Sequence, residues 1–97
     1  MFTGTAVFDV LLPGDCRSLK EKRSYVRPIV ASLRKIDVSV AEVGDMDRHG
    51  RSQIGVGVVA SEHSHVQDVL DSCERLVSRR PEIELLSVRR RVFGPED

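Results

Sequence analysis

The segment Ser18-Leu19-Lys20-Glu21-Lys22-Arg23 stands where a first strand gives way to a first helix. Ser18 followed three residues later by Glu21 is a capping box, in which a serine hydroxyl and a glutamate carboxylate each accept a hydrogen bond from a free backbone N–H. This pattern predicts a helix that begins at Ser18. The same segment carries the clearest functional signal of the chain, because its cations stand where a helix disfavours positive charge.

These cations predict an anion site at the start of the helix. A helix N-terminus carries partial positive charge, so each cation there costs roughly 0.3–1 kcal/mol, and only Glu21 offsets them. Free N–H groups, the helix dipole and the side chains would all point at a phosphate. The alternative is a solvated basic face whose long stems cover apolar surface. We expect the side chains of Lys22 and Arg23 to extend beyond the core. The predicted anion site consists of Arg17, Ser18, Lys20, Lys22, Arg23 and Arg27.

The composition is that of a small globular chain. Its 97 residues fit one domain, residues 1–97. Apolar residues make up 40% and charged residues 31%, which excludes a disordered chain. The net charge is zero, so the chain as a whole has no attraction for nucleic acid or membranes. Any basic site must therefore be a local patch.

The cysteine content and the apolar runs bear on the compartment. Cys16 and Cys73 are too few for a disulfide framework, and we expect both to be reduced thiols. The N-terminus lacks the basic and apolar regions of a signal peptide, and no apolar run approaches the length of a membrane span. We therefore expect a cytoplasmic protein with no membrane segment and no cofactor.

Hydrophobic periodicity predicts four strands and two helices. Strands are expected over residues 2–12, 36–43, 53–60 and 83–93, and the first helix over residues 18–35. Pro28 predicts a kink in this helix or a break near Arg27. Either Ser61 or Ser64 is expected to cap the second helix, which Pro81 ends. The last strand carries three consecutive arginines and is expected to bulge or to protrude past the sheet, before a frayed tail over residues 94–97.

This order of elements predicts an α+β fold, the ferredoxin-like βαββαβ sandwich. In it, a four-stranded antiparallel sheet carries two helices on one face. Right-handed crossovers place the first and third strands side by side, and we expect that pair to be parallel. The other face stays open. Alternation along the first strand exposes either Val7 and Leu11, or Phe8, Val10 and Leu12.

The open face predicts an interface. Gly55 and Gly57 lie on one side of the third strand and leave a shallow groove that another backbone could approach. Exposed apolar patches of this kind usually mark an interaction site. A homodimer that pairs two sheet faces is the simplest solution. The predicted dimer interface consists of Val7, Leu11, Gly55, Gly57 and Val59.

Three segments of the chain resemble the bacterial YlxP-like family, namely residues 7–14, 18–23 and 38–43. The combination of SLKEKR with VSVAEV is the specific part, and the similarity spans essentially the whole chain. The resemblance implies a ferredoxin-like fold. It implies no activity, since the family is a domain of unknown function. Its members are often encoded among translation and ribosome-maturation genes, which is an association with that process.

Two functional hypotheses remain open. In the first, the protein is an RNA- or ribosome-associated accessory factor that binds phosphates through the helix start, with residues 79–80 and 89–91 as further basic groups. Three phenylalanines and one tyrosine do not make an RNA-stacking sheet, so binding would be to backbone and shape. In the second, the protein is a homodimeric interaction module that uses the open sheet face and binds no nucleic acid.

An enzyme is a third possibility, which the motifs do not favour. Asp45, Asp47 and His49 share one loop and could hold a metal or transfer a proton. Carboxylates in a hairpin loop more often stabilise the turn. His63 and His65 are two residues apart and do not share a helix face. The chain has no phosphate-binding glycine loop, nucleophile elbow or CxxC pair. We therefore predict no catalytic residue, no metal site and no enzymatic activity, with a small-ligand sensor as a remaining alternative.

Overall fold

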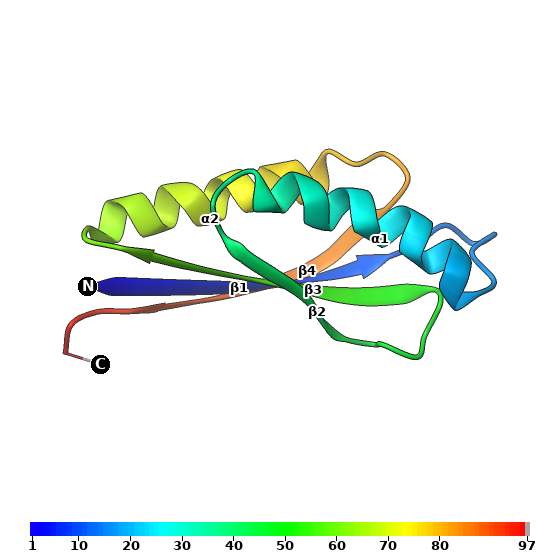
Figure 1. Ribbon diagram of the computed structural model, residues 1–97, viewed down its shortest axis with the longest axis horizontal. Helices are drawn as coiled ribbons and strands as arrows, with labels where there is room; N and C mark the ends of the chain where they lie inside the picture. The colour runs from blue at the N-terminus through cyan, green and yellow to red at the C-terminus, as the bar shows by residue number, and fades with distance from the viewer. Residues whose placement is uncertain (97) are drawn as a thin grey trace.

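Six elements follow one another in the predicted order in a computed structural model that describes residues 1–96 (Figure 1). Asp97, the end of the predicted tail, lies outside the described residues. The elements are β1 (Phe2–Leu11), α1 (Leu19–Arg34), β2 (Ser39–Gly44), β3 (Arg51–Ala60), α2 (His63–Ser78) and β4 (Glu84–Phe93).

The four strands form one sheet in the order β2-β3-β1-β4, and every neighbouring pair is antiparallel. The predicted ferredoxin-like sandwich is confirmed. The predicted adjacency of β1 and β3 is correct, but the expectation that they run parallel is wrong. The crossover through α1 joins β1 to β2. The β2–β3 hairpin then reverses the chain, so β3 returns antiparallel between them.

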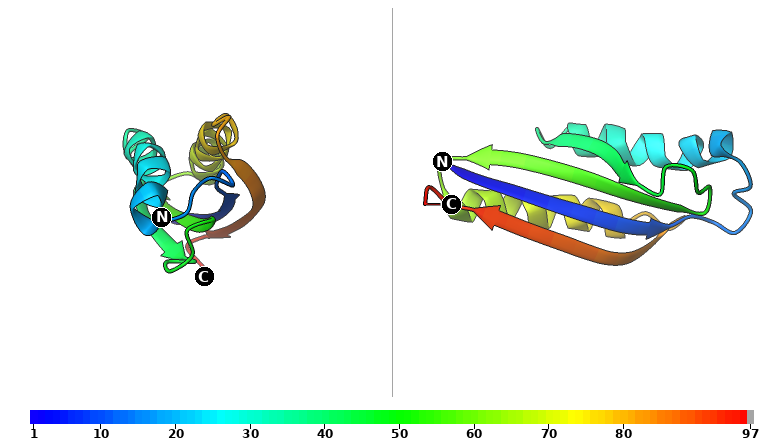
Figure 2. Two further views of the ribbon diagram at one scale, coloured as in Figure 1. Left: turned by 90° about the vertical axis from the view of Figure 1, so that its right-hand side faces the viewer. Right: turned by 90° about the horizontal axis from the view of Figure 1, so that it is seen from below.

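Both helices cover the same face of the sheet, and the opposite face carries no helix (Figure 2). This settles which side of β1 is buried. Phe8, Val10 and Leu12 are buried under the helices, while Val7 and Leu11 alternate with them and face the open side. The helices contribute their apolar stripes to the same core: Val26, Ile29 and Leu33 from α1, and Val66, Leu70, Cys73 and Val77 from α2.

A glycine in β1 lets α2 approach the sheet closely. A Cβ atom at Gly4 would collide with the side chain of Val66 and would lie 3.1 Å from Leu70 Cδ1. Both side chains are fully buried members of the core. The distance between α2 and the sheet is therefore set by the absence of a side chain at Gly4.

The start of α1 is the predicted capping box. Ser18 Oγ accepts a hydrogen bond from the backbone N–H of Glu21 at 3.1 Å, and the Glu21 carboxylate accepts one from the N–H of Arg17 at 3.1 Å. The helix then runs unbroken through Pro28, so the predicted break near Arg27 is wrong. Buried residues on both sides of the proline hold the two halves of the helix on one core, which offsets the missing backbone bond.

The start of α2 differs from the prediction. The helix begins at His63 after Glu62, whose side chain makes no capping hydrogen bond, and neither predicted serine caps it. Because β3 continues to Ala60, the connection has only two residues, and Ser64 already lies in the first turn. The strand β2 begins at Ser39, because Asp37, with φ of 62°, still belongs to the turn that follows α1.

The edge strand β4 carries the predicted irregularity. Its register with β1 shifts between Asp9 and Val10. Of its three consecutive arginines, Arg90 points toward α2, where it pairs with Asp71 and Glu74. Arg89 and Arg91 alternate with it and face the open side.

Candidate functional site

The predicted site residues occupy two surfaces on opposite sides of the molecule. The first is the outer side of α1, and the second is the open sheet face (Figures 1 and 2). The prediction of an anion site concerned the first surface, and the prediction of a dimer interface concerned the second.

Lys22 is buried at the start of α1. Only 3% of its side chain is exposed, and Nζ lies 2.7 Å from Glu42 Oε2 on β2. Nζ also donates to the backbone oxygen of Asp45 at 2.7 Å, and Ser52 Oγ donates to the same Glu42 oxygen at 2.7 Å. The expectation that Lys22 extends beyond the core is wrong, because β2 offers a carboxylate directly beneath the helix. Its charge is neutralised within the fold and does not contribute to an anion site.

The sequence contained a signal for this ion pair that the prediction did not use. The alternation Val38, Val40, Glu42 places a carboxylate on the buried side of β2. A charge on the apolar side of a strand needs a buried partner. Lys22 interrupts the apolar stripe of α1 in the same way, so each residue was a clue to the other.

Two backbone N–H groups at the start of α1, those of Arg17 and Glu21, already donate hydrogen bonds to side chains of the capping box. The capping box uses the hydroxyl of Ser18 and the carboxylate of Glu21, which is itself an anion at the helix N-terminus. A phosphate at this position would meet that carboxylate. Ser18 therefore caps the helix, and its hydroxyl is already engaged with the backbone N–H of Glu21.

Three of the predicted cations line one hollow on the outer side of α1. Lys20, Arg23 and Arg27 surround it together with Ser24 and Pro28, and its volume is about 380 Å³. All three side chains are exposed. None of the three forms an ion pair within residues 1–96. We call this surface the cationic hollow. Arg17 is exposed just before the helix and does not line it.

The other predicted basic groups include two that stabilise the fold. Arg80 donates to the Pro28 carbonyl at 3.2 Å and to Ser32 Oγ at 2.8 Å, which ties the end of α2 to α1. Arg90 forms ion pairs with Asp71 at 2.8 Å and Glu74 at 3.0 Å. Burial lowers the pKa of the Arg90 guanidinium, but the hydrogen bonds to these carboxylates outweigh it and raise the pKa above its ordinary value.

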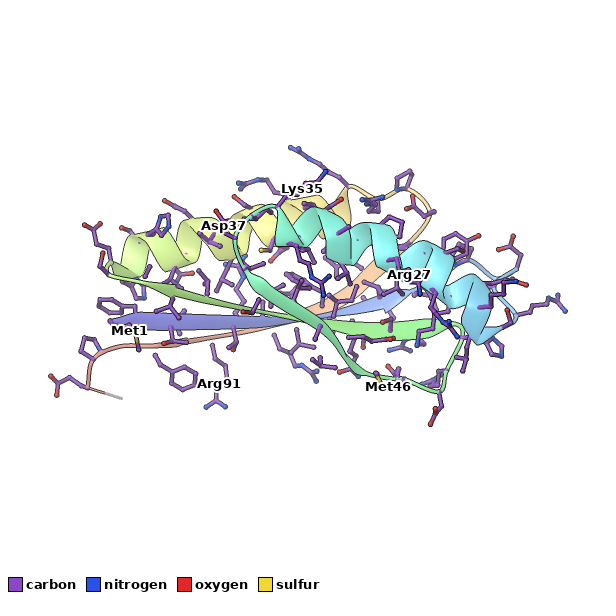
Figure 3. The ribbon with its side chains drawn as sticks, in the orientation of Figure 1. Met1, Arg27, Lys35, Asp37, Met46 and Arg91 are labelled. Atoms are coloured by element: carbon purple, nitrogen blue, oxygen red, sulfur yellow. The ribbon has the colours of Figure 1, made fainter. Side chains whose placement is uncertain are left out.

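A second hollow lies between α1 and the turn after β2, on the other side of Arg23 and Arg27. Its volume is about 240 Å³. Figure 3 labels Arg27 on α1 and Met46 on the turn, toward the same end of the molecule. We call it the inter-element hollow, and it is lined by Leu19, Lys22, Arg23, Val26, Arg27, Glu42 and Met46. The side chains of Leu19 and Met46 in its wall are 42% and 55% exposed.

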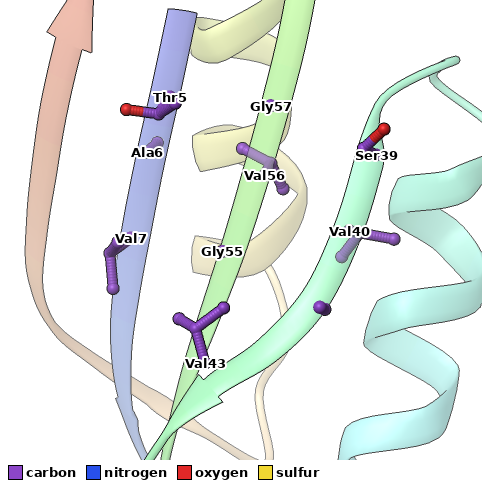
Figure 4. Close-up of a pocket in the computed structure, with 10 residues that line it drawn as sticks. Thr5, Ala6, Val7, Ser39, Val40, Val43, Gly55, Val56 and Gly57 are labelled. Carbon is purple, nitrogen blue, oxygen red and sulfur yellow. The ribbon is translucent and has the colours of Figure 1, made fainter.

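The open sheet face carries an apolar groove with a volume of about 390 Å³ (Figure 4). Gly55 and Gly57 form its floor on β3, with Val7 on β1 and Val43 on β2 at its sides. A Cβ atom at Gly55 would lie 3.0 Å from Val43 Cγ1, whereas one at Gly57 would meet nothing closer than 4.0 Å. Beside the groove, 61% of the Val59 side chain is exposed.

Polar groups border this groove on the same face. Arg51 Nη2 lies 2.8 Å from Asp9 Oδ2, and Arg89 donates to Gln53 Oε1 at 3.0 Å. The Arg91 guanidinium lies 5.1 Å from the centre of the Phe93 ring. Leu11, at the far end of β1, is 39% exposed. Four of the five predicted interface residues thus lie at or beside the groove, and Leu11 lies at the end of the strand.

The loop that raised the possibility of an enzyme is held by structural contacts. Asp45 accepts a hydrogen bond from Gln53 Nε2 at 3.3 Å and has a φ of 56°. His49 Nδ1 lies 3.1 Å from the Cys16 carbonyl, and Cys16 Sγ donates to the His49 carbonyl at 2.9 Å. Burial and the carboxylate of Glu21 raise the pKa of the Cys16 thiol. Within residues 1–96, no group of three or more His, Cys, Asp or Glu side chains is placed to hold a metal ion.

Neither helix of the described chain has the length and apolarity that a membrane crossing requires. Residues 3–90 match the family described as "Protein of unknown function (DUF503)". The chain is similar to "Uncharacterized protein YlxP" of Bacillus subtilis (strain 168), with 31% identity over 80 residues, which cover 81% of this chain and 87% of that protein.

Two solved structures have a similar fold. One is a mutant of SnoaB, a cofactor-independent oxygenase from Streptomyces nogalater, with a TM-score of 0.53, 12% identity and coverage of 98% of this chain and 94% of the other. The second is a de novo designed protein with a ferredoxin fold, with a TM-score of 0.53, 12% identity and coverage of 100% and 88%. At these identities the likeness concerns the fold alone.

Proposed function

The chain belongs to the DUF503 family of proteins of unknown function, as its resemblance to the YlxP-like family predicted, and from this premise we propose that it is a binding protein and not an enzyme. In this proposal it works in the cytoplasm as a pair of identical chains joined through the open sheet face. The free thiols of Cys16 and Cys73 fit a reducing compartment. Asp45 and His49, two of the three side chains that suggested catalysis, are engaged in hydrogen bonds of the fold.

The observation that carries the dimer is the apolar groove on the uncovered face. The floor at Gly57 is open, and Val59 projects from the same strand two residues away. One face therefore offers both a hollow and a projection. A two-fold axis brings such a face against itself, so that the projection of each chain can enter the hollow of the other. This self-complementarity favours a second copy as the occupant.

The size of the face also fits a stable dimer. Three of its strands have ten residues each, and a strand of that length is about 33 Å long. Four strands are about 19 Å wide, which gives a projected area of roughly 600 Å². The accessible surface of side chains exceeds their projection, so the face approaches the roughly 800 Å² per partner that stable interfaces bury.

The dimer is tested by the mass of the protein in solution. We expect the wild-type chain to have twice the mass of one chain by light scattering. Val59→Lys places a charge in the proposed interface and should yield a monomer. Leu19→Lys adds the same charge at an exposed apolar side chain on the helix side and should leave the dimer intact. A monomeric wild type, or a dimer that survives Val59→Lys, would contradict the proposal.

A second candidate function, binding to RNA or a ribosomal subunit, is supported by the cationic hollow. Lys20, Arg23 and Arg27 project from one side of α1 without ion-pair partners in the described chain, and each can neutralise a backbone phosphate. Contacts of this kind give affinity without reading sequence. The two functions are compatible, because α1 lies on the side of the sheet that a face-to-face dimer leaves exposed.

Co-sedimentation with ribosomal subunits at two salt concentrations tests this candidate. The triple variant Lys20→Ala/Arg23→Ala/Arg27→Ala should lose saturable binding. For any binding that remains, the slope of log K against log salt should be smaller in magnitude by about two to three, because three phosphate contacts are lost. The matched control is Arg34→Ala/Lys35→Ala/Arg79→Ala, which removes three exposed cations outside the hollow. Equal loss in both variants would indicate general charge attraction and would contradict a site at the hollow.

A further inference from the structure

We propose that the inter-element hollow between α1 and the turn after β2 binds the base of a nucleotide, while Arg23 and Arg27 hold the phosphate of that nucleotide. The proposal deepens the phosphate-binding candidate and rests on it, because the two hollows share these arginines. A phosphate on the cationic side and a base on the other side would straddle the ridge formed by the two side chains.

The walls of the inter-element hollow suit the flat face of a base. Leu19 and Met46 are two of the large apolar side chains that remain exposed, at 42% and 55%, and both line this hollow. Val26, which belongs to the core and is 7% exposed, also lines this hollow. Packing of the fold leaves this apolar surface in contact with water. A planar heteroaromatic group inserted between these side chains would cover it.

The acceptor inside the hollow suits the polar edge of a base. Glu42 Oε2 receives hydrogen bonds from Lys22 and Ser52, which fix the carboxylate in place. Within residues 1–96 the other oxygen, Oε1, has no hydrogen-bond partner, and no buried side-chain N or O atom of the described chain lacks one. Oε1 is therefore open to a ligand. A fixed carboxylate oxygen accepts from the exocyclic amino group of adenine, cytosine or guanine.

The amino group distinguishes these bases from uracil. Uracil offers only a ring N–H between two carbonyl oxygens, which the carboxylate repels. The guanidinium groups of Arg23 and Arg27 can also stack on a base while they neutralise the phosphate. The proposed ligand is therefore recognised by three of its own features: the flat apolar face of its base, the N–H donor on the edge of the base, and the phosphate next to it.

The volume limits what enters. At 240 Å³, the hollow is smaller than the roughly 300–1,000 Å³ of sites that enclose whole drug-sized ligands. It can take a base, but the sugar and phosphate must remain outside at the arginines. The same chemistry occurs in a free nucleoside monophosphate and in one nucleotide of an RNA strand, so the test must separate these two sources.

The experiment is isothermal titration calorimetry of the full chain with AMP, CMP, GMP and UMP, and with ribose 5-phosphate as the ligand without a base. A six-residue oligoadenylate represents the strand. The variant Leu19→Ala/Met46→Ala trims both apolar walls without changing charge. The matched control, Leu86→Ala, trims an equally exposed apolar side chain away from this hollow.

We expect AMP, CMP and GMP, or the oligoadenylate alone if the source is RNA, to bind at least tenfold more tightly than ribose 5-phosphate. UMP should bind more weakly than the other three nucleotides. The wall variant should lose this advantage and keep its affinity for ribose 5-phosphate, whereas the control should behave as wild type. Binding of nucleotides and oligoadenylate that the wall variant leaves unchanged would overturn the base site.

The failure of this proposal can be told apart from failure of the phosphate-binding candidate. If the triple cation variant loses oligoadenylate binding and the wall variant keeps it, the phosphate site stands and the base site is excluded. If wild-type protein binds none of the nucleotides, the oligoadenylate and the ribosomal subunits, both proposals are excluded.

Discussion

The position of Lys22 shows how a single charge can serve the fold where the sequence suggested a ligand site. Its side chain is 3% exposed and its ammonium is held by Glu42 and by the Asp45 carbonyl. Burying two charges costs several kcal/mol each, and their attraction offsets that cost only when the remaining hydrogen bonds are made. Here they are made, and the pair fixes the start of α1 to β2 and its turn.

Removing one partner of the Lys22–Glu42 ion pair should lower the free energy of unfolding more than removing both partners. Lys22→Met leaves a carboxylate beneath the helix without its cation and should lower the free energy of unfolding by about 2–4 kcal/mol, less than for a fully buried pair because Glu42 is 22% exposed. The double variant Lys22→Met/Glu42→Met should lose less than the sum of its single changes. Urea denaturation of the four proteins gives the coupling energy, and additive losses would contradict the ion pair as a unit.

The buried thiol of Cys73 should make the fold sensitive to alkali. Burial raises its pKa above the ordinary 9.0, and the nearby Arg90 opposes the shift only in part. A raised folded-state pKa contributes stability that is fully present below the unfolded-state pKa and is lost as the pH rises through the folded-state pKa. Urea midpoints under reducing conditions should therefore fall above about pH 9.

The matched variant for this pH dependence is Cys73→Ala. It should flatten the alkaline fall, although its stability at pH 7 will be lower because a core side chain is lost. The pKa of the Cys16 thiol is also raised, so part of the slope should remain. An unchanged slope in Cys73→Ala would exclude this thiol as the titrating group.

The residue-level predictions failed where a partner lay far away in the sequence. The capping box at Ser18 and Glu21 was predictable because both partners lie within one helical turn. The partner of Lys22 stands 20 residues away on a strand, and only the fold shows that the two meet. The inter-element hollow was missed for the same reason, since its walls come from α1, β2 and the turn after β2.

At the level of elements, Gly4 of β1 and Gly57 of β3 should differ in their tolerance of a side chain. Gly4 lies under α2, where any side chain would collide with Val66, whereas Gly57 has open space on the other face. Gly4→Ala should push the helix from the sheet and lower the free energy of unfolding by about 1–3 kcal/mol. Gly57→Ala should change monomer stability little and should weaken the dimer. Thermal denaturation with light scattering measures both, and equal tolerance at Gly4 would contradict the close approach.

The elements themselves were largely predictable, because each depends on a local period. The alternation in β1 and β3 and the stripes of both helices gave the order and the fold class. The relative direction of the strands was harder to predict. The first and third strands were correctly predicted to be neighbours, but they are antiparallel and not parallel. The end of β3 at Ala60 was predicted correctly, but α2 begins at His63 after Glu62, so neither predicted serine cap is used.

For the molecule as a whole, a face-to-face dimer predicts that stability depends on concentration. If association stabilises the folded chains, a higher protein concentration shifts the equilibrium toward the folded dimer. A tenfold rise in concentration should raise the melting temperature by roughly 3–6 °C. Val59→Lys should remove this dependence. A melting temperature that is constant over a hundredfold range of wild-type concentration would contradict the dimer.

The run of arginines on β4 has a consequence for how crowded copies of the chain behave. β4 is an edge of the sheet, so one side of its ten-residue backbone has no partner strand. Such an edge is a template on which strands of other molecules can add to form aggregates. Arg89, Arg90 and Arg91 place guanidinium groups on both faces of this edge, and an incoming copy of β4 would bring the same charges against them. Copies of the chain should therefore resist adding to one another edge to edge through β4.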